Sequence, residues 1–167
     1  MQGLEYEWVK GVRYQNRIES FLNEIDAIMV PTLSERVCIW DYAGKLARLA
    51  ETLYIVREEC DIASCSVYCN SKVAFISSIA VKRGFLGQGI GSVLMDEVKR
   101  YVRAKKCESI QLEVYTPNTI ALKFYAKNGF SVLTENGDVK RMEFLFESKD
   151  LNTPEDLIQH FANDILL

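Results

Sequence analysis

The sequence predicts one α/β domain in which helices flank a mixed sheet. Apolar residues recur every three or four positions over residues 16–29, as on the buried face of an amphipathic helix. Three later runs, residues 52–58, 62–69 and 73–81, are instead rich in β-branched and aromatic residues. Short polar turns separate these runs, which is the pattern of an antiparallel meander. A glycine-rich loop over residues 87–91 then leads into another amphipathic run, so the chain combines both kinds of element.

The first part of the chain predicts two helices. Asn16, with Glu19 three residues later, resembles a capping box that would begin the helix over 16–29, and Pro31 would end it. A shorter helix is expected to begin near Asp41. The early part of the chain is therefore mainly helical, and the predicted strands follow it.

After the meander, helices and strands alternate. The glycine-rich loop leads into a helix over residues 89–105, and a buried strand is expected over 109–115. A helix over 119–128 follows, and Gly129 suits the left-handed cap that commonly ends a helix. This strand–loop–helix–strand–helix order is typical of an α/β chain.

A hairpin and a tail complete the chain. Asn136-Gly137 lies between two apolar runs, which is a strong hairpin signal. In the tail the apolar residues recur at helical spacing. We therefore expect a single domain over residues 1–150 and a C-terminal amphipathic helical extension over 151–167.

Composition excludes several classes of protein. The net charge of −3 and the pI near 5.3 weigh against a nucleic-acid partner. No apolar run approaches the roughly 18 residues of a membrane span, and the N-terminus lacks the pattern of a signal peptide, so a cytoplasmic location is expected. Five cysteines and one histidine suit neither a disulfide framework nor a zinc site, so no metal is expected.

The glycine-rich loop predicts an anion site. Gly87, Gly89 and Gly91 begin a helix, where backbone N–H groups and the helix dipole favour negative charge. Ser92 stands where a dinucleotide-binding fingerprint needs its third glycine, and the loop has no lysine of a nucleotide-triphosphatase phosphate loop. A tight turn that only caps the helix is the alternative.

Two motifs in order resemble the GNAT superfamily of acetyl-CoA-dependent N-acetyltransferases. Residues 76–91, ISSIAVKRGFLGQGIG, are similar to its strand, glycine loop and helix start, and residues 112–130, LEVYTPNTIALKFYAKNGF, to its second motif. The resemblance implies a three-layer fold with a mostly antiparallel central sheet between helices. It also implies acetyl-CoA as co-substrate. The apolar stripe of the tail could pack on its own domain or on another copy, so a monomer or a homodimer is expected, and charge and hydropathy predict no nucleic-acid or membrane partner.

The resemblance implies where acetyl-CoA would bind. The pyrophosphate would lie on the loop N–H groups, and the pantetheine arm would pair with one strand, where the family's two central strands part. The family usually has Arg or Gln at the position of Leu86, so this residue predicts weaker cofactor binding. Lys82 or Arg83 could supply the missing positive charge. The alternative is that these two side chains only form part of a solvated loop. The implied cofactor contacts are Ile79, Ala80, Val81, Leu86, Gly87, Gln88, Gly89, Ile90, Gly91, Ser92, Asn118 and Tyr125.

The resemblance also implies catalytic roles. Tyr125 matches the tyrosine that protonates the departing thiolate, with ordinary core packing as the alternative. Asn118 is either a helix cap or a cofactor contact, or both. In several family members a glutamate early in the strand before the glycine loop acts as the general base, but the matching position here lies near Phe75. The general base stays open between Glu113, the nearest strand carboxylate, and a water chain to main-chain carbonyls, and a rim or structural role is the alternative for Glu113.

The acceptor is expected to be the primary amine of a small polar molecule, such as an amino sugar or nucleotide-sugar. A loose similarity to members found with surface-polysaccharide genes makes four residues of the early helix and meander candidates for substrate contact. An amphipathic helix and a strand end are the alternative explanation of these residues. The alternative function is a catalytically silent acyl-CoA-binding or regulatory module. The four candidates are Tyr42, Lys45, Tyr68 and Asn70.

Overall fold

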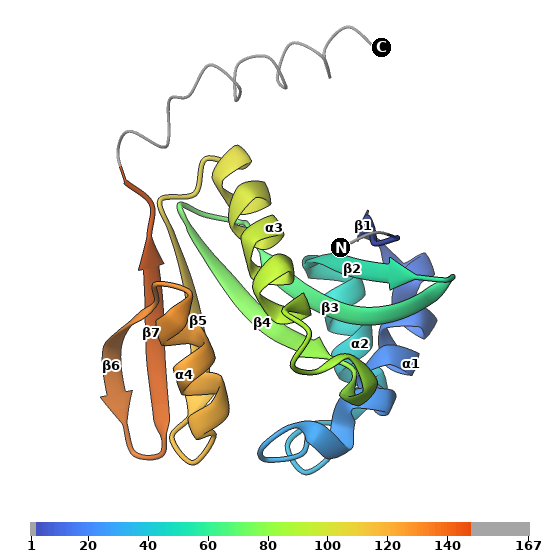
Figure 1. Ribbon diagram of the computed structural model, residues 1–167, viewed down its shortest axis with the longest axis horizontal. Helices are drawn as coiled ribbons and strands as arrows, with labels where there is room; N and C mark the ends of the chain where they lie inside the picture. The colour runs from blue at the N-terminus through green and yellow to red at the C-terminus, as the bar shows by residue number, and fades with distance from the viewer. Residues whose placement is uncertain (1–2, 148–167) are drawn as a thin grey trace, which may run out of the picture.

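The computed structural model describes residues 3–147, which form a seven-stranded sheet with helices on both faces (Figure 1). The strand order is β1-β2-β3-β4-β5-β7-β6. The strands are β1 (Glu5–Val9), β2 (Glu51–Arg57), β3 (Cys60–Tyr68), β4 (Val73–Val81), β5 (Ser109–Tyr115), β6 (Ser131–Asn136) and β7 (Val139–Leu145). The helices are α1 (Gln15–Ile25), α2 (Ile39–Leu49), α3 (Ile90–Ala104) and α4 (Thr119–Lys127), with short 3₁₀ turns η1 (Val12–Tyr14), η2 (Asp26–Ile28) and η3 (Arg83–Phe85).

The sheet separates two apolar cores. Helices α1 and α2 cover one face with residues such as Ile25 and Leu46, and α3 and α4 cover the other with residues such as Leu94 and Tyr125. The expected three-layer, mostly antiparallel fold is therefore confirmed. No helix within residues 3–147 is both long and apolar enough to cross a membrane.

Most predicted elements are confirmed, with differences at the N-terminal end. The meander β2-β3-β4 is antiparallel, and the hairpin turns through the two residues Gly137 and Asp138. The capping box at Asn16 is wrong: η1 runs directly into α1, so Tyr14 is the cap residue and no side chain caps the helix. Strand β1 was not predicted. The predicted tail helix lies outside the described residues.

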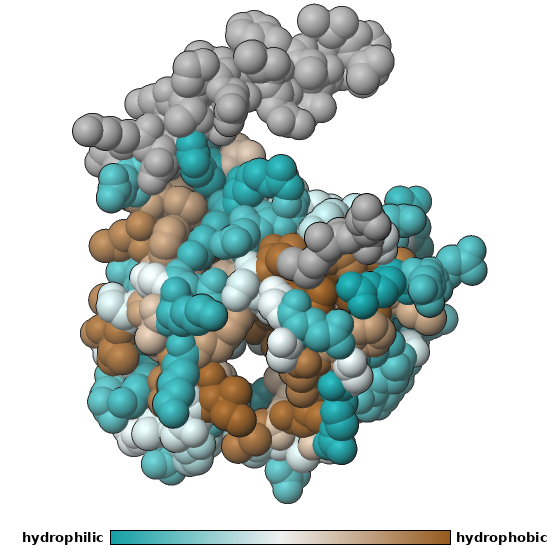
Figure 2. Space-filling model, in the orientation of Figure 1, coloured by the Kyte–Doolittle hydropathy of each residue, from teal (hydrophilic) through white to brown (hydrophobic). Residues whose placement is uncertain are grey.

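Strands β4 and β5 are parallel neighbours that pair along only part of their length. Pairing runs from Val73–Ser109 to Ile76–Leu112, after which β4 continues with β3 and β5 continues with β7. Ser77–Val81 are only half-buried although β4 is the central strand of the sheet. Figure 2 shows an opening, bordered by apolar side chains, in the region where Figure 1 shows the two strands diverging. We call this parting of the two strands the fork.

The buried tyrosines predict that stability falls at alkaline pH. Burial raises the pKa of Tyr54 and Tyr125, and it raises the pKa of Tyr42 to about 12. Above pH about 10, the unfolded chain releases tyrosine protons that the folded chain retains. The folded state then binds more protons, so the free energy of unfolding falls as pH rises, while below pH about 10 this contribution is fully present.

Urea unfolding between pH 8 and 11.5 measures this effect, with Tyr54→Phe as the comparison. The variant removes one buried phenol, so its stability should fall less steeply above pH 10, by up to about 1.4 kcal/mol per pH unit. Identical slopes for the two proteins would contradict the prediction.

Candidate active site

The glycine loop presents backbone N–H groups at the start of α3. Gly87 and Gly89 have φ values of 75° and 78°, a left-handed conformation that glycine adopts without steric cost. The first helical hydrogen bonds run from the N–H groups of Ser92 and Val93 to the Gly89 carbonyl, at 3.1 and 3.2 Å. The N–H groups of Ile90 and Gly91 therefore lie ahead of the helical ladder, where the helix dipole also favours an anion.

Gly91 has a different role from the two turn glycines. A Cβ at this position would lie 3.1 Å from Phe124 Cε2 on α4 and 3.8 Å from Val81 Cγ2 on β4. Glycine thus allows α3 to approach both elements closely. This contact holds the glycine loop next to the fork.

The side chains around the loop carry little positive charge toward it. Lys82 forms an ion pair with Glu24 on α1 at 2.5 Å and lies 5.4 Å from the ring centroid of Phe21. Arg83 is exposed, and Leu86 is 54% exposed. Gln88 donates to the Gly84 carbonyl at 3.1 Å, which stabilises the turn itself. Lys82 is therefore directed to α1, and Arg83 remains as the basic residue beside the loop.

The free edge of β4 offers backbone groups to the fork. The Lys82 N–H donates to the Ile62 carbonyl on β3 at 2.9 Å. Because hydrogen-bonding direction alternates along an antiparallel strand, Ala80 also faces β3, whereas Ile79 and Val81 direct their N–H and C=O groups into the fork. An extended ligand could pair there as an additional strand.

A β-bulge lies where β4 leaves β5. Ser66 pairs with Ser78 and Val67 with Ile76, so Ser77 is the extra residue. The Tyr42 hydroxyl from α2 lies 2.8 Å from the Ser77 carbonyl oxygen, to which it donates, and 2.8 Å from Ser77 Oγ. Burial raises the pKa of Tyr42 to about 12, so the hydroxyl remains protonated at neutral pH. Helix α2 thereby fixes the backbone at the fork.

The other predicted substrate residues lie in different places. The Tyr68 hydroxyl is buried near that of Tyr42 and has no hydrogen-bond partner within residues 3–147. Lys45 is exposed one helical turn after Tyr42. Asn70 is exposed between β3 and β4, at the end of β4 opposite the glycine loop. The structure thus brings Tyr42 and Tyr68 together and leaves Asn70 away from the fork.

Helix α4 positions Tyr125 and Asn118. Tyr125 is 8% exposed and packs against Phe124 and Phe130, with ring centroids 5.4 and 5.9 Å away. Burial raises the pKa of Tyr125, and the nearby Cys65 thiol acts in the same direction, so the phenol keeps its proton. Asn118 Oδ1 accepts the Ala121 N–H at 3.1 Å, which makes Asn118 the N-cap of α4.

Glu113 is the first β5 residue beyond the pairing with β4. Its neighbours Leu112 and Val114 are buried against α3 and α4, so alternation directs Glu113 to the opposite face. There Glu113 Oε1 lies 2.7 Å from Nη2 of Arg141 on β7. A carboxylate thus stands at the fork, paired with an arginine.

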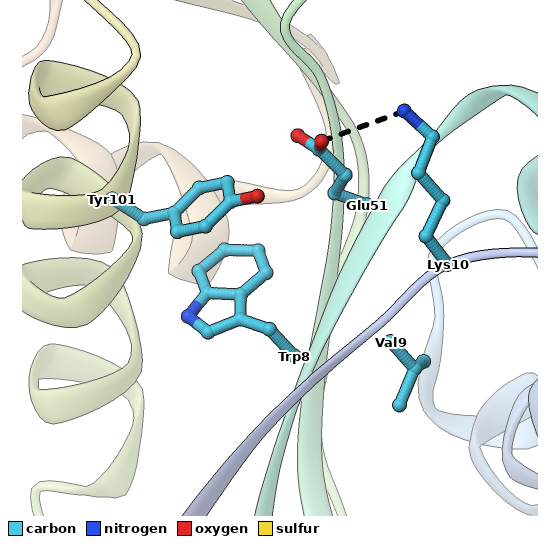
Figure 3. A pocket seen from close by; sticks show the side chains of 5 residues that line it. All are labelled: Trp8, Val9, Lys10, Glu51 and Tyr101. Carbon is cyan, nitrogen blue, oxygen red and sulfur yellow. Dashed lines mark hydrogen bonds and ion pairs between the residues drawn. The ribbon is translucent and has the colours of Figure 1, made fainter. Parts of the chain in front are cut away.

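A small pocket lies elsewhere in the fold. Figure 3 shows Trp8 stacked on Tyr101, with centroids 3.7 Å apart, beside the ion pair of Glu51 with Lys10. The pocket holds about 100 Å³ and involves β1, β2 and the last turns of α3, away from the glycine loop. Its contacts join β1 to the rest of the fold.

Within residues 3–147 no three His, Cys, Asp or Glu side chains are placed to hold a metal ion. The glycine loop, the fork and the buried Tyr125 are the features from which the candidate site is built.

Comparison with known proteins identifies the class. The sequence model of the Acetyltransferase (GNAT) family matches residues 13–130, and the chain belongs to this family. N-alpha-acetyltransferase 60 of Danio rerio is 31% identical over 103 residues, which cover 60% of this chain and 39% of that protein. The protein of the same name from Xenopus tropicalis is 34% identical over 77 residues, which cover 44% of this chain and 32% of that protein. The matched segments thus span well under half of these relatives.

Solved structures show the same fold at low identity. The PaiA N-acetyltransferase of Thermoplasma acidophilum, in complex with coenzyme A, has a TM-score of 0.64 and 17% identity, covering 85% of this chain and 99% of that chain. The ribosomal-protein-S18-alanine N-acetyltransferase of Escherichia coli has a TM-score of 0.66 and 15% identity, and the match covers 90% of this chain and 99% of that chain.

Proposed function

We propose that this protein is an acetyl-CoA-dependent N-acetyltransferase that acts on the primary amine of a small polar molecule. The fork carries the proposal: a central strand with an unpaired edge leads directly into a glycine loop at a helix start, in a chain of the GNAT family. The structural neighbour from Thermoplasma acidophilum, which has this fold, is a complex with coenzyme A.

The residues at the fork fit this co-substrate. The half-buried edge at Ile79 and Val81, which no strand pairs with on the fork side, suits the amide groups of the pantetheine arm, which need hydrogen-bond partners. The loop N–H groups from Gly87 to Ser92 suit the pyrophosphate. Acetyl-CoA would supply the acetyl group as a thioester, and the amine nitrogen would attack its carbonyl carbon. The Ile79 N–H would stabilise the oxyanion that this attack forms, and the C–S bond would then break to leave the new amide.

Tyr125 would act as the general acid. Its buried phenol keeps its proton and lies in the core beneath α4, beside the fork. That proton would pass to the departing thiolate sulfur and later return from solvent. Asn118 supports this arrangement as the cap of the same helix, and its amide nitrogen would also reach the cofactor.

Glu113 would act as the general base. An amine with pKa about 10.4 is only about one part in a thousand neutral at pH 7, so removing its proton costs about 4–5 kcal/mol without assistance. Glu113 stands at the fork on the face opposite α4, where an incoming amine would meet it. Tyr42 and Tyr68 would line the acceptor side, with Lys45 at its rim.

A second acceptor class comes from the comparisons. The Danio rerio and Xenopus tropicalis relatives are named N-alpha-acetyltransferases, which favours the α-amine of a polypeptide. A third candidate function is an acyl-CoA-binding module without catalysis.

Thiol release from acetyl-CoA with a panel of amino sugars, amino acids and peptides tests the proposal. Tyr125→Phe should lower kcat about 100-fold or more and leave coenzyme A affinity close to wild type, because a general acid contributes about 10²–10⁴-fold. Tyr101→Phe, remote from the fork, is the control and should retain kcat. Unchanged turnover of Tyr125→Phe over pH 6–9 would refute the acid role, and cofactor binding without turnover of any amine would support the silent module.

The turn glycines should matter for cofactor affinity. Gly89→Ala places a side chain on a left-handed residue that faces the proposed pyrophosphate, so coenzyme A affinity should fall about tenfold. Gly84→Ala is the matched control, because Gly84 has no positive φ and an added Cβ meets no atom within 4 Å. Calorimetric titration with coenzyme A measures the affinity of both variants. An equal loss of affinity in Gly89→Ala and Gly84→Ala would show that the loop does not hold the phosphates.

Leu86 should limit cofactor affinity. Leu86→Arg adds a cation beside the loop and should strengthen coenzyme A binding about fivefold at low salt, with the gain fading near 0.5 M salt as charges are screened. Leu145→Arg, at a leucine that is 67% exposed at the end of β7, controls for net charge. The same affinity in wild type and Leu86→Arg at low salt would contradict the prediction.

A further inference from the structure

A polar pocket of about 330 Å³ lies on the outer face of strands β5, β7 and β6. Glu113 pairs with Arg141 across β5 and β7, and Arg141 pairs with Thr134 across β7 and β6, so these three residues form one row. Their side chains face away from α3 and α4, because the alternating residues Val114 and Met142 are buried in that core. Asn136 and Val139 complete the lining.

The pocket begins at the fork. Leu112 is the last β5 residue to pair with β4, and Glu113 is the next residue along the strand. Arg141 lies one strand farther from the fork. A ligand in this pocket would therefore reach the fork at its Glu113 end.

The two charges at the pocket are available to a ligand. The side chains of Arg141 and Glu113 are 45% and 47% exposed, and their contact is the single approach of Nη2 to Oε1 at 2.7 Å. An ion pair this exposed contributes little to stability, so a ligand can replace either partner at small cost. Arginine binds a carboxylate through two parallel N–H groups, and a glutamate accepts from an ammonium group.

We infer that this pocket binds the acceptor as a zwitterion, with Glu113 on the ammonium group and Arg141 on a carboxylate. The substrate class is then small amino acids and related amines that carry an anionic group. The Thr134 hydroxyl and the Asn136 amide supply neutral hydrogen bonds to the rest of the ligand. The inference rests on the proposed function and specifies its acceptor.

The same arrangement accounts for product release. Glu113 takes the first proton that the ammonium group loses, and the second leaves the nitrogen to solvent as the amide forms, which balances the proton that Tyr125 gives to the thiolate. The acetylated nitrogen is then neutral. The product keeps its carboxylate contact to Arg141 and loses the contact of its nitrogen to Glu113. It therefore binds more weakly than the substrate.

Matched pairs of an amino acid and its amide, which lacks the carboxylate, test the inference with acetyl-CoA and the full chain. The wild-type kcat/KM should be at least about tenfold higher for the acid, and Arg141→Gln should lower the acid-to-amide ratio about 10- to 100-fold, chiefly through KM. Lys140→Gln is the control. Lys140 is the next residue on β7, on the other face, and its Nζ lies 3.6 Å from Glu135 Oε2.

Each outcome separates the two proposals. Equal turnover of acids and amides, or a ratio that Arg141→Gln leaves unchanged, overturns the zwitterion site while the acetyltransferase stands. Turnover confined to peptides overturns the small acceptor. Absence of turnover with every amine, although coenzyme A binds, overturns the proposed function and the acceptor site together.

Discussion

Strands β4 and β5 stop pairing after Ile76 and Leu112 because each continues with a different antiparallel partner. Backbone N–H and C=O groups in the middle of a sheet normally pair with a neighbouring strand, and leaving them unpaired away from water is costly. The half-buried residues Ser77–Val81 meet this demand by remaining accessible. The fold therefore maintains an unpaired hydrogen-bonding edge at its centre.

Elements distant in sequence hold the fork in place. Helix α2 contributes the Tyr42 hydroxyl, which fixes the bulge at Ser77 from one face of the sheet. On the other face, the close approach of Gly91 to Phe124 joins α3 to α4. The positions of the glycine loop and of Tyr125 are consequently linked, since both depend on the same helix contact. A displacement of Phe124 would disturb both.

Periodicity predicted most of the fold. The three-strand meander and the strand at 109–115 were predicted because their β-branched runs are bounded by turn residues. Strand β1 was missed because it is a short edge strand in which only Val9 is buried. Its remaining positions are exposed or half-buried, so no apolar run marks them. Edge strands of this kind are defined by pairing with β2, which a local pattern does not contain.

The candidate site was predictable where backbone conformation determines it and not where side chains meet across the fold. Gly87 and Gly89 indicate a left-handed turn from the sequence alone, because glycine is the residue that adopts positive φ at no steric cost. The contact of Lys82 with Glu24 joins residues in different helices and turns, so local spacing could not have predicted it. Asn70 was predicted from a loose similarity to family members, but it lies in the turn between β3 and β4, at the end of β4 opposite the glycine loop.

The sheet also separates the proposed general acid from the proposed general base. Tyr125 lies in the core beneath α3 and α4, whereas Glu113 faces the opposite side of β5. A general acid and a general base in direct contact would hydrogen-bond to each other, and neither would then be free to contact the substrates. With the strand between them, Glu113 can accept a proton from an amine on one face while Tyr125 donates one to a thiolate on the other. The fork thus provides a path for the reacting atoms while β5 keeps the acid and the base apart.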